Sequence, residues 1–113
     1  MRQFVTTVLE RRKELDAPIV TEPYETAWAS EATFYVRLHS EVDRIPTLYC
    51  RAQTSLDGIT WVDLPAATID PGTAGDHRLP LTHFDGWLRI IVIPADREDY
   101  SDVTATLALV LKE

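Results

Sequence analysis

Three histidines are the first residues that could hold a metal ion or move a proton in catalysis. They are His39, His77 and His83, and none of them falls in the HxH or HExxH spacing that holds zinc. His39 is expected on the wet face of a strand, while His77 and His83 flank one short strand. The pattern favours three unrelated surface histidines over a zinc site, so we assign no metal ligand.

The sequence offers no combination of nucleophile, base and oxyanion donor. It contains no GxSxG elbow, no phosphate-binding glycine loop and no pairing of cysteine with histidine. Cys50 is the single cysteine, so no intrachain disulfide can form. Its place on the apolar side of an alternating strand favours a buried hydrophobic residue over a reactive thiol. We therefore predict no catalytic residue, no cofactor and no enzymatic activity.

Carboxylates gather in one loop near the C-terminus. Asp96, Glu98, Asp99 and Asp102 supply the oxygen ligands that calcium prefers. However, Arg97 lies among them, and the loop lacks the alternating acids and central glycine of an EF-hand. A solvated loop is favoured over a cation site.

Five aromatic residues could form a flat surface for a sugar: Trp28, Tyr35, Tyr49, Trp61 and Trp87. In a sheet protein, Trp61 and Trp87 occupy positions where large residues pack between strands. Packing is therefore favoured over a ligand platform, and a protein interface remains the third alternative.

Composition narrows the class of partner. The chain of 113 residues has a formal net charge of −7, which argues against binding to nucleic acid or to an anionic membrane. No apolar stretch approaches the ~20 residues that span a bilayer, and the N-terminus lacks the apolar core and cleavage site of a signal peptide. We expect one cytosolically made globular domain.

The residues 47–64 form the most clearly predicted element, a β-hairpin. Leu48, Cys50 and Ala52 alternate with polar residues, as in a half-buried strand. The sequence Ser55-Leu56-Asp57-Gly58 supplies the turn, and strand-forming residues follow from Ile59.

Further strands are predicted on either side of this hairpin. Residues 32–42 alternate with one apolar face, residues 65–75 read as a loop, and residues 77–84 carry Pro80, which suggests a sheet edge. Residues 87–93 are apolar on both sides, which predicts a central strand or one covered by a partner. With a last strand over 103–111, the total is about seven or eight antiparallel strands in an all-β sandwich or jelly roll.

The N-terminal residues 1–27 differ from the rest in composition, because their apolar residues lie among polar and charged ones. Thr7 and Glu10 could form the capping box of a helix over 8–15, but the β-branched run from Val5 to Val8 favours an extended strand. Residues 19–21 could add a short edge strand. We divide the chain into an extended arm, 1–27, and a sandwich domain, 28–113, and expect the arm to lie on its own domain or on a neighbour.

Two resemblances follow from these residues. The motif Ser55-x-Asp57-Gly58-x-x-Trp61 resembles the strand–turn–strand of discoidin-like carbohydrate-binding sandwiches. The whole layout, with the polar arm, this hairpin, the Gly86-Trp87-Leu88-Arg89-Ile90 strand and an apolar last strand, is similar to small accessory proteins of tailed phages and prophages, such as capsid decoration or head-associated proteins.

The second resemblance implies a structural role without catalysis, in the virion or in the cytoplasm before assembly. It implies self-association, for instance as a trimer, and binding to a capsid lattice. Extended arms bind by adding a strand to a sheet edge, so we assign partner contacts to the apolar residues of the arm: Phe4, Val5, Val8, Leu9, Ile19 and Val20. The alternative is a carbohydrate- or ligand-binding module.

Overall fold

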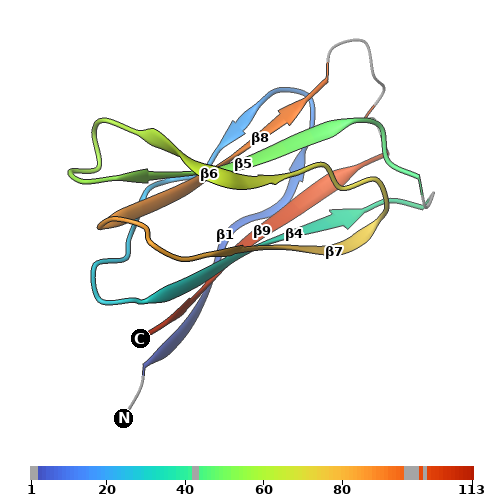
Figure 1. Ribbon diagram of the computed structural model, residues 1–113. Coiled ribbons are helices and arrows are strands. Elements are labelled where there is room, and N and C mark those ends of the chain that lie inside the picture. The colour runs from blue at the N-terminus through green and yellow to red at the C-terminus, as the bar shows by residue number, and fades with distance from the viewer. Residues whose placement is uncertain (1–2, 42–43, 96–99, 101) are drawn as a thin grey trace.

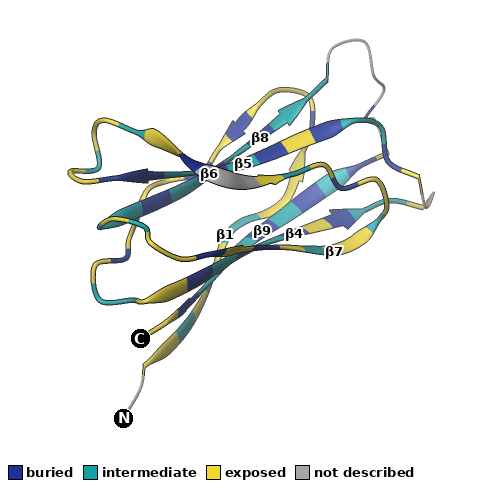
Figure 2. Cartoon of the chain, in the orientation of Figure 1, coloured by how far each residue is buried: buried dark blue, intermediate teal, exposed yellow. Residues whose placement is uncertain are grey.

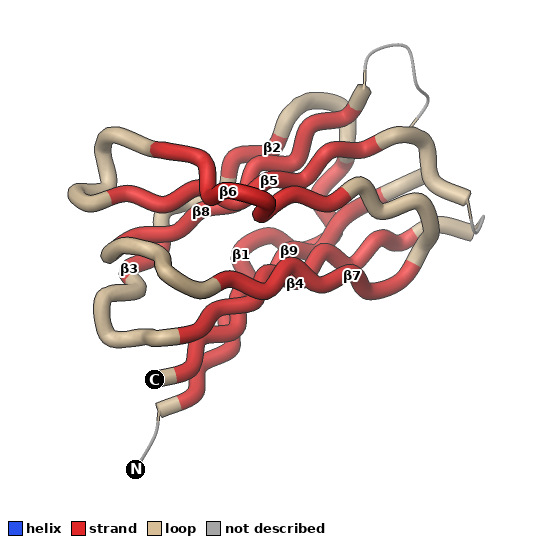
Figure 3. The backbone as a smooth tube through the Cα atoms, viewed as in Figure 1, coloured by secondary structure: helices blue, strands red, loops and turns tan. Residues whose placement is uncertain are grey.

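The protein is an all-β sandwich of two antiparallel sheets (Figure 1). The computed structural model describes residues 3–41, 44–95, 100 and 102–113. Within these residues all regular structure is strand and there is no helix (Figure 3). The described part of the chain therefore holds no helix that could cross a membrane.

The nine strands of the described residues divide into two sheets. Sheet A has the order β1-β9-β4-β7 and consists of β1 (Phe4–Glu14), β4 (Glu31–His39), β7 (Gly75–Leu81) and β9 (Thr104–Lys112). Sheet B has the order β2-β8-β5-β6, with β3 also paired to β8, and consists of β2 (Ile19–Val20), β3 (Tyr24–Glu25), β5 (Leu48–Ser55), β6 (Val62–Ile69) and β8 (Trp87–Pro94).

The core lies between the sheets and is built by alternation along the long strands. Every second residue of β4 and β9 is buried, which appears as dark bands in Figure 2. Phe34 of β4, Leu109 of β9 and Ile90 of β8 have no exposed surface. Full burial of such a side chain contributes roughly 1.5–3 kcal/mol, so these inward faces hold the sheets together as the alternation predicted.

The N-terminal residues are extended, which confirms the strand and excludes the helix over 8–15. β1 pairs with β9 along its length, from Phe4 opposite Lys112 to Glu14 opposite Thr104. β2 and β3 both pair with β8, and Leu15 and Ile19 are buried in the core. Strands from both sides of residue 27 therefore share the same two sheets.

Local predictions around the hairpin are mostly confirmed. β5 pairs with β6 as expected, and β8 is a central strand with partners on both sides. Pro80 lies in β7, one of the two outermost strands of sheet A.

The loop predicted at 65–75 is wrong over its first half. β6 begins at Val62, not at Ile59, and continues through Pro65 to Ile69. The missing N–H of Pro65 is tolerated because β6 is an outermost strand of sheet B, and its pairing with β5 shifts register between Arg51 and Gln53.

Candidate functional site

The outer face of sheet A, which is turned away from the core, places residues from all four strands side by side. One row crosses the sheet through Val8, Ala108, Tyr35 and Arg78, each directly opposite the next. Directly opposed residues lie on the same face of an antiparallel sheet. Residues that are up to a hundred positions apart in sequence thus form one surface.

A groove of about 400 Å³ runs over this face. It is lined by Phe4, Thr6, Val8, Arg11, Thr33, Tyr35, Arg37, Asp76, Arg78, Thr106, Ala108, Val110 and Lys112. Four of the chain's 11 lysines and arginines are in this lining, against one of its 18 acidic residues. The groove is therefore a cationic surface on an acidic protein, suited to an acidic partner.

One ion pair bridges β4 and β7 inside the groove. Arg37 Nε donates to Asp76 Oδ1 at 2.6 Å, and Arg37 Nη2 donates to Asp76 Oδ2 at 3.0 Å. The hydrogen bonds from Arg37 lower the pKa of the Asp76 carboxyl. Both side chains are about half exposed, so the pair adds little stability. The pairing leaves Arg11, Arg78 and Lys112 as the cations of the groove whose charge Asp76 does not offset directly.

Two aromatic rings of this face make cation–π contacts with basic side chains. The guanidinium carbon of Arg78 lies 5.8 Å from the centroid of the Tyr35 ring, and Lys112 Nζ lies 5.7 Å from that of Phe4. On sheet B, Arg89 covers Trp61 at 4.3 Å. A ring face occupied by a cation is not free to stack on a sugar, so the geometry disfavours Tyr35 and Trp61 as a sugar platform.

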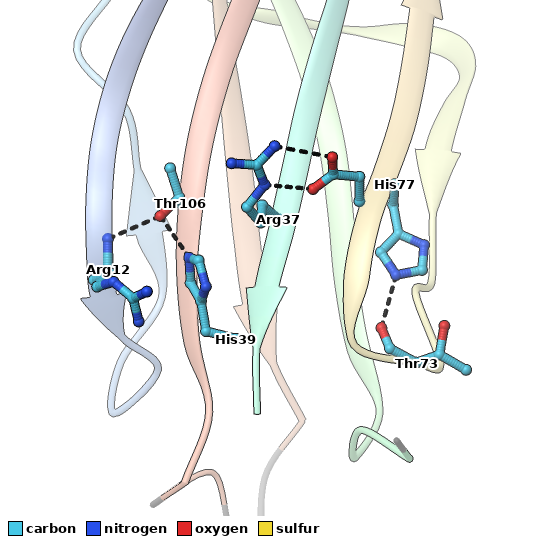
Figure 4. A network of polar contacts seen from close by, with 7 residues as sticks. Arg12, Arg37, His39, Thr73, His77 and Thr106 are labelled. Atoms are coloured by element: carbon cyan, nitrogen blue, oxygen red, sulfur yellow. Dashed lines mark hydrogen bonds and ion pairs between the residues drawn. The ribbon is translucent and has the colours of Figure 1, made fainter. Parts of the chain in front are cut away.

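Figure 4 shows a polar network at the end of the groove. Thr106 Oγ1 accepts a hydrogen bond from the backbone N–H of Arg12 at 3.1 Å and lies 2.8 Å from His39 Nε2. Arg12 has a φ of 50°, a conformation that non-glycine residues rarely adopt. The contact with Thr106 therefore helps hold β1 at a register shift between Glu10 and Lys13.

The pair of His39 and Thr106 resembles a base beside a hydroxyl, but its surroundings make it a poor base. Burial lowers the pKa of His39, and the charges of Arg12 and Arg37 lower it further. A weaker base is less able to take a proton from a hydroxyl near neutral pH. The contact joins β4 to β9 on the outer face of sheet A.

The other two histidines lie apart from it. His77 Nε2 is 2.7 Å from the carbonyl oxygen of Thr73 (Figure 4), so this nitrogen carries the hydrogen and donates. His83 is exposed, with a φ of 57°. The described residues contain no group of three histidine, cysteine or acidic side chains that could hold a metal ion.

Of the six residues predicted to contact partners, the structure brings two together. Phe4 is 62% exposed and Val8 is 44% exposed, and both line the groove. Val5 lies opposite the buried Leu111 and faces inward.

The remaining three predicted contacts lie elsewhere. Leu9 packs partly against the core, and Ile19 is buried in it. Val20 is exposed, but it lies on β2 in sheet B. The structure therefore does not gather the six residues into one surface.

The hairpin motif has a local structural role. Ser55 Oγ accepts from the N–H of Gly58 at 2.9 Å and donates to the carbonyl of Thr60 at 2.6 Å. Asp57 Oδ1 accepts from the N–H groups of Ile59 and Thr60, and these bonds lower the pKa of Asp57. The turn is thus built by its own polar side chains.

The cysteine is buried as predicted, and burial raises the pKa of the Cys50 thiol to about 12. A thiol with such a pKa is inert near neutral pH. Of the proposed cation loop, Asp96, Glu98 and Asp99 lie outside the described residues, and Asp102 is exposed.

Sequence reasoning missed the cationic lining of the groove. Alternation placed Tyr35 and Arg37 on a wet face, but it did not reveal that Arg78 and Lys112 join them. The missing signal is strand pairing, since β4 lies between β7 and β9 from distant parts of the chain.

No protein-family model and no curated protein matches the sequence. Two prophage proteins share the fold. The SPBc2 prophage-derived protein YomS has a TM-score of 0.67 at 6% identity, covering 100% of this chain and 96% of YomS. The PBSX exported protein XepA has a TM-score of 0.68 at 8% identity over 95% of this chain, which spans only 36% of XepA.

A carbohydrate-binding protein shares the fold as well. The low-affinity xylan-binding module CBM86 from Roseburia intestinalis has a TM-score of 0.54 at 12% identity, covering 96% of this chain and 94% of the module. Both resemblances drawn from the sequence, to prophage sandwiches and to carbohydrate-binding sandwiches, are therefore confirmed at the level of fold.

Proposed function

We propose that this chain is a non-enzymatic accessory protein of a phage or prophage particle, which self-associates and binds a protein lattice. The observation that carries the proposal is the position of Phe4 and Val8, which are exposed on β1, an outermost strand of sheet A, and border the cationic groove. Exposed apolar residues beside arginines are typical of protein interfaces. The likeness to YomS over the full length of both chains supports the class.

The charge of the groove defines the lattice surface that it would fit. Arg11, Arg78 and Lys112 attract an acidic patch, and such attraction acts mainly on the rate of encounter and on the choice of partner. Binding to the lattice is expected to weaken as salt is raised, because exposed charges are screened. The protein would occur in the particle, and in the cytoplasm before assembly.

A carbohydrate-binding module is the second candidate. The shared fold with CBM86 and the exposure of Tyr49, at 53%, favour it. The cations over Tyr35 and Trp61 disfavour it, because they occupy ring faces that a sugar would need.

The first experiment is the solution mass of the full chain, measured by light scattering after size exclusion over a range of concentrations. We expect an oligomer that the double variant Phe4→Ser/Val8→Ser loses and that Val20→Ser, an exposed valine on the other sheet, retains. A monomer at every concentration would overturn the self-association. Retardation of the protein in a xylan-containing gel, lost in Tyr49→Ala, would favour the module instead.

A further inference from the structure

Most sheet edges of this protein are protected against pairing with another chain. β7 carries Pro80, which cannot donate a backbone hydrogen bond, and β6 carries Pro65 beside a register shift. β2 and β3 have two residues each. Such short, kinked or proline-bearing edges are the usual means by which sheet proteins avoid adding strands.

β1 is protected over only half of its length. Its C-terminal half contains both register shifts and the basic run Arg11-Arg12-Lys13. Its N-terminal half, Phe4–Val8, pairs with β9 residue by residue without a shift and carries no charge. Figure 1 shows this segment beside the end of β9 at one extremity of the molecule. Among the edges of the described strands, Phe4–Val8 is therefore the long stretch that combines regular pairing with the absence of proline and of charge.

We propose that Phe4–Val8 pairs in antiparallel fashion with the same segment of a second copy, about a two-fold axis at Thr6. The inference rests on the self-association of the proposed function and names its surface. In this register Phe4 lies opposite the partner's Val8, Val5 opposite the partner's Thr7, and Thr6 opposite the partner's Thr6. Aromatic with β-branched residues and threonine with threonine are favourable cross-strand pairs.

The sequence of the segment selects a second copy and this register. Only a self-complementary segment satisfies a two-fold axis, and Phe-Val-Thr-Thr-Val is apolar at both ends with threonine at its midpoint. Larger offsets would place Glu10 or Arg11 opposite the uncharged residues and would enter the part of β1 where the register shifts. The regular stretch therefore fixes the axis at its own midpoint.

The pairing has a consequence for the groove. Phe4, Thr6 and Val8 all line it, and directly opposed residues share a face. Two four-stranded sheets would join into one sheet of eight strands, with the two cationic grooves adjacent on one side. The dimer would thus present a doubled cationic surface to the acidic lattice.

The first test is a cysteine at the axis. Residues directly opposed in antiparallel strands have Cα atoms roughly 4.5–5.5 Å apart, a spacing that a disulfide spans. We expect mild oxidation to convert most of Thr6→Cys to a covalent dimer. Val8→Cys is the matched control, because its two copies would be about four residues, or roughly 13 Å, out of register. The native Cys50 is buried and does not compete.

The second test places charged residues at positions 4 and 8, which the proposed register sets opposite each other, and measures whether the chain still forms a dimer. In Phe4→Lys/Val8→Lys, each dimer would hold two directly opposed pairs of like charge, and we expect a monomer. In Phe4→Lys/Val8→Glu, the opposed charges attract, and we expect the dimer to return. Within one chain the two positions are four residues, or roughly 13 Å, apart, so residues 4 and 8 of the same chain do not pair with each other.

The outcomes separate this inference from the proposed function. If the chain self-associates but Thr6→Cys cross-links no better than Val8→Cys, the surface is wrong while self-association stands. If both double-charge variants have the same mass, the register is wrong. If the native chain is monomeric at every concentration and Thr6→Cys fails to cross-link, both proposals fail.

Discussion

Gly58 packs against the indole of Trp87 so closely that a Cβ atom at position 58 would lie 3.3 Å from Cε2 of the ring. Gly58 also has a φ of 80°, which L residues with a side chain adopt only at a cost. The turn of the hairpin can thus pack against Trp87, the first residue of the central strand β8, because Gly58 has no side chain.

Gly58→Ala should therefore destabilise the protein. Both the strained backbone and the contact with Trp87 oppose the added methyl group, and we expect a loss of about 1–3 kcal/mol in the free energy of unfolding. Urea unfolding followed by tryptophan fluorescence measures it. Gly75→Ala is the matched control, because Gly75 also has a positive φ, of 104°, and a Cβ there meets nothing within 4 Å; equal losses in the two variants would contradict the role of Trp87.

The turn should also make stability depend on pH. Hydrogen bonds from the N–H groups of Thr60 and Ile59 lower the pKa of Asp57 in the folded state. A carboxyl whose pKa is depressed by folding adds stability above its unfolded pKa of about 4 and loses it as pH falls through the folded pKa.

Asp57→Asn keeps an acceptor oxygen but does not titrate in this range. As the pH is lowered from about 5, carboxyl groups become protonated. Over this range we expect the melting temperature of the native chain to fall more steeply than that of Asp57→Asn. Circular dichroism melts at a series of pH values measure the difference. Parallel curves would show that the turn does not contribute.

The hairpin also shows what a sequence can predict. The strand β5, the turn and the burial of Cys50 depend on residues within 20 positions of one another, and alternation with turn chemistry is enough to reveal them, whereas the second strand begins and ends later than predicted. The two apolar faces of residues 87–93 left open whether β8 is a central strand or one covered by a partner, and the structure shows a central strand.

The candidate site could not be predicted in the same way. Its rows join Phe4 to Lys112 and Tyr35 to Arg78, and pairing at such separation depends on how the sheets assemble rather than on any local pattern. The loop predicted from Pro65 was wrong for a related reason. A proline within a strand is expected only at a sheet edge, and the sequence did not show that β6 is an edge strand.

Thr21 fastens the N-terminal segment to the central strand. Its Oγ1 accepts from the N–H of Ile90 at 3.0 Å, and the site is buried. Thr21→Val keeps the shape but leaves that N–H without this acceptor, for which we expect a loss of about 1–3 kcal/mol.

Thr33→Val, on the outer face of sheet A, is the control and should change stability by less than about 0.5 kcal/mol. Chemical denaturation of both variants measures the difference. Equal stabilities would mean that a water replaces the hydroxyl of Thr21.

Deleting residues 1–22 tests whether the N-terminal segment is an arm or part of the domain. The deletion removes β1 and so exposes the edge of β9, and it takes Leu15 and Ile19 out of the core. Truncating one such buried residue to alanine costs about 2–5 kcal/mol, while a whole domain is stable by only about 5–15 kcal/mol. We therefore expect residues 23–113 alone to lack a cooperative thermal transition, whereas a chain lacking only residues 1–3 should keep one. A cooperative melt of the 23–113 fragment would mean that the sandwich folds without its first strand, as an arm at 1–27 would require.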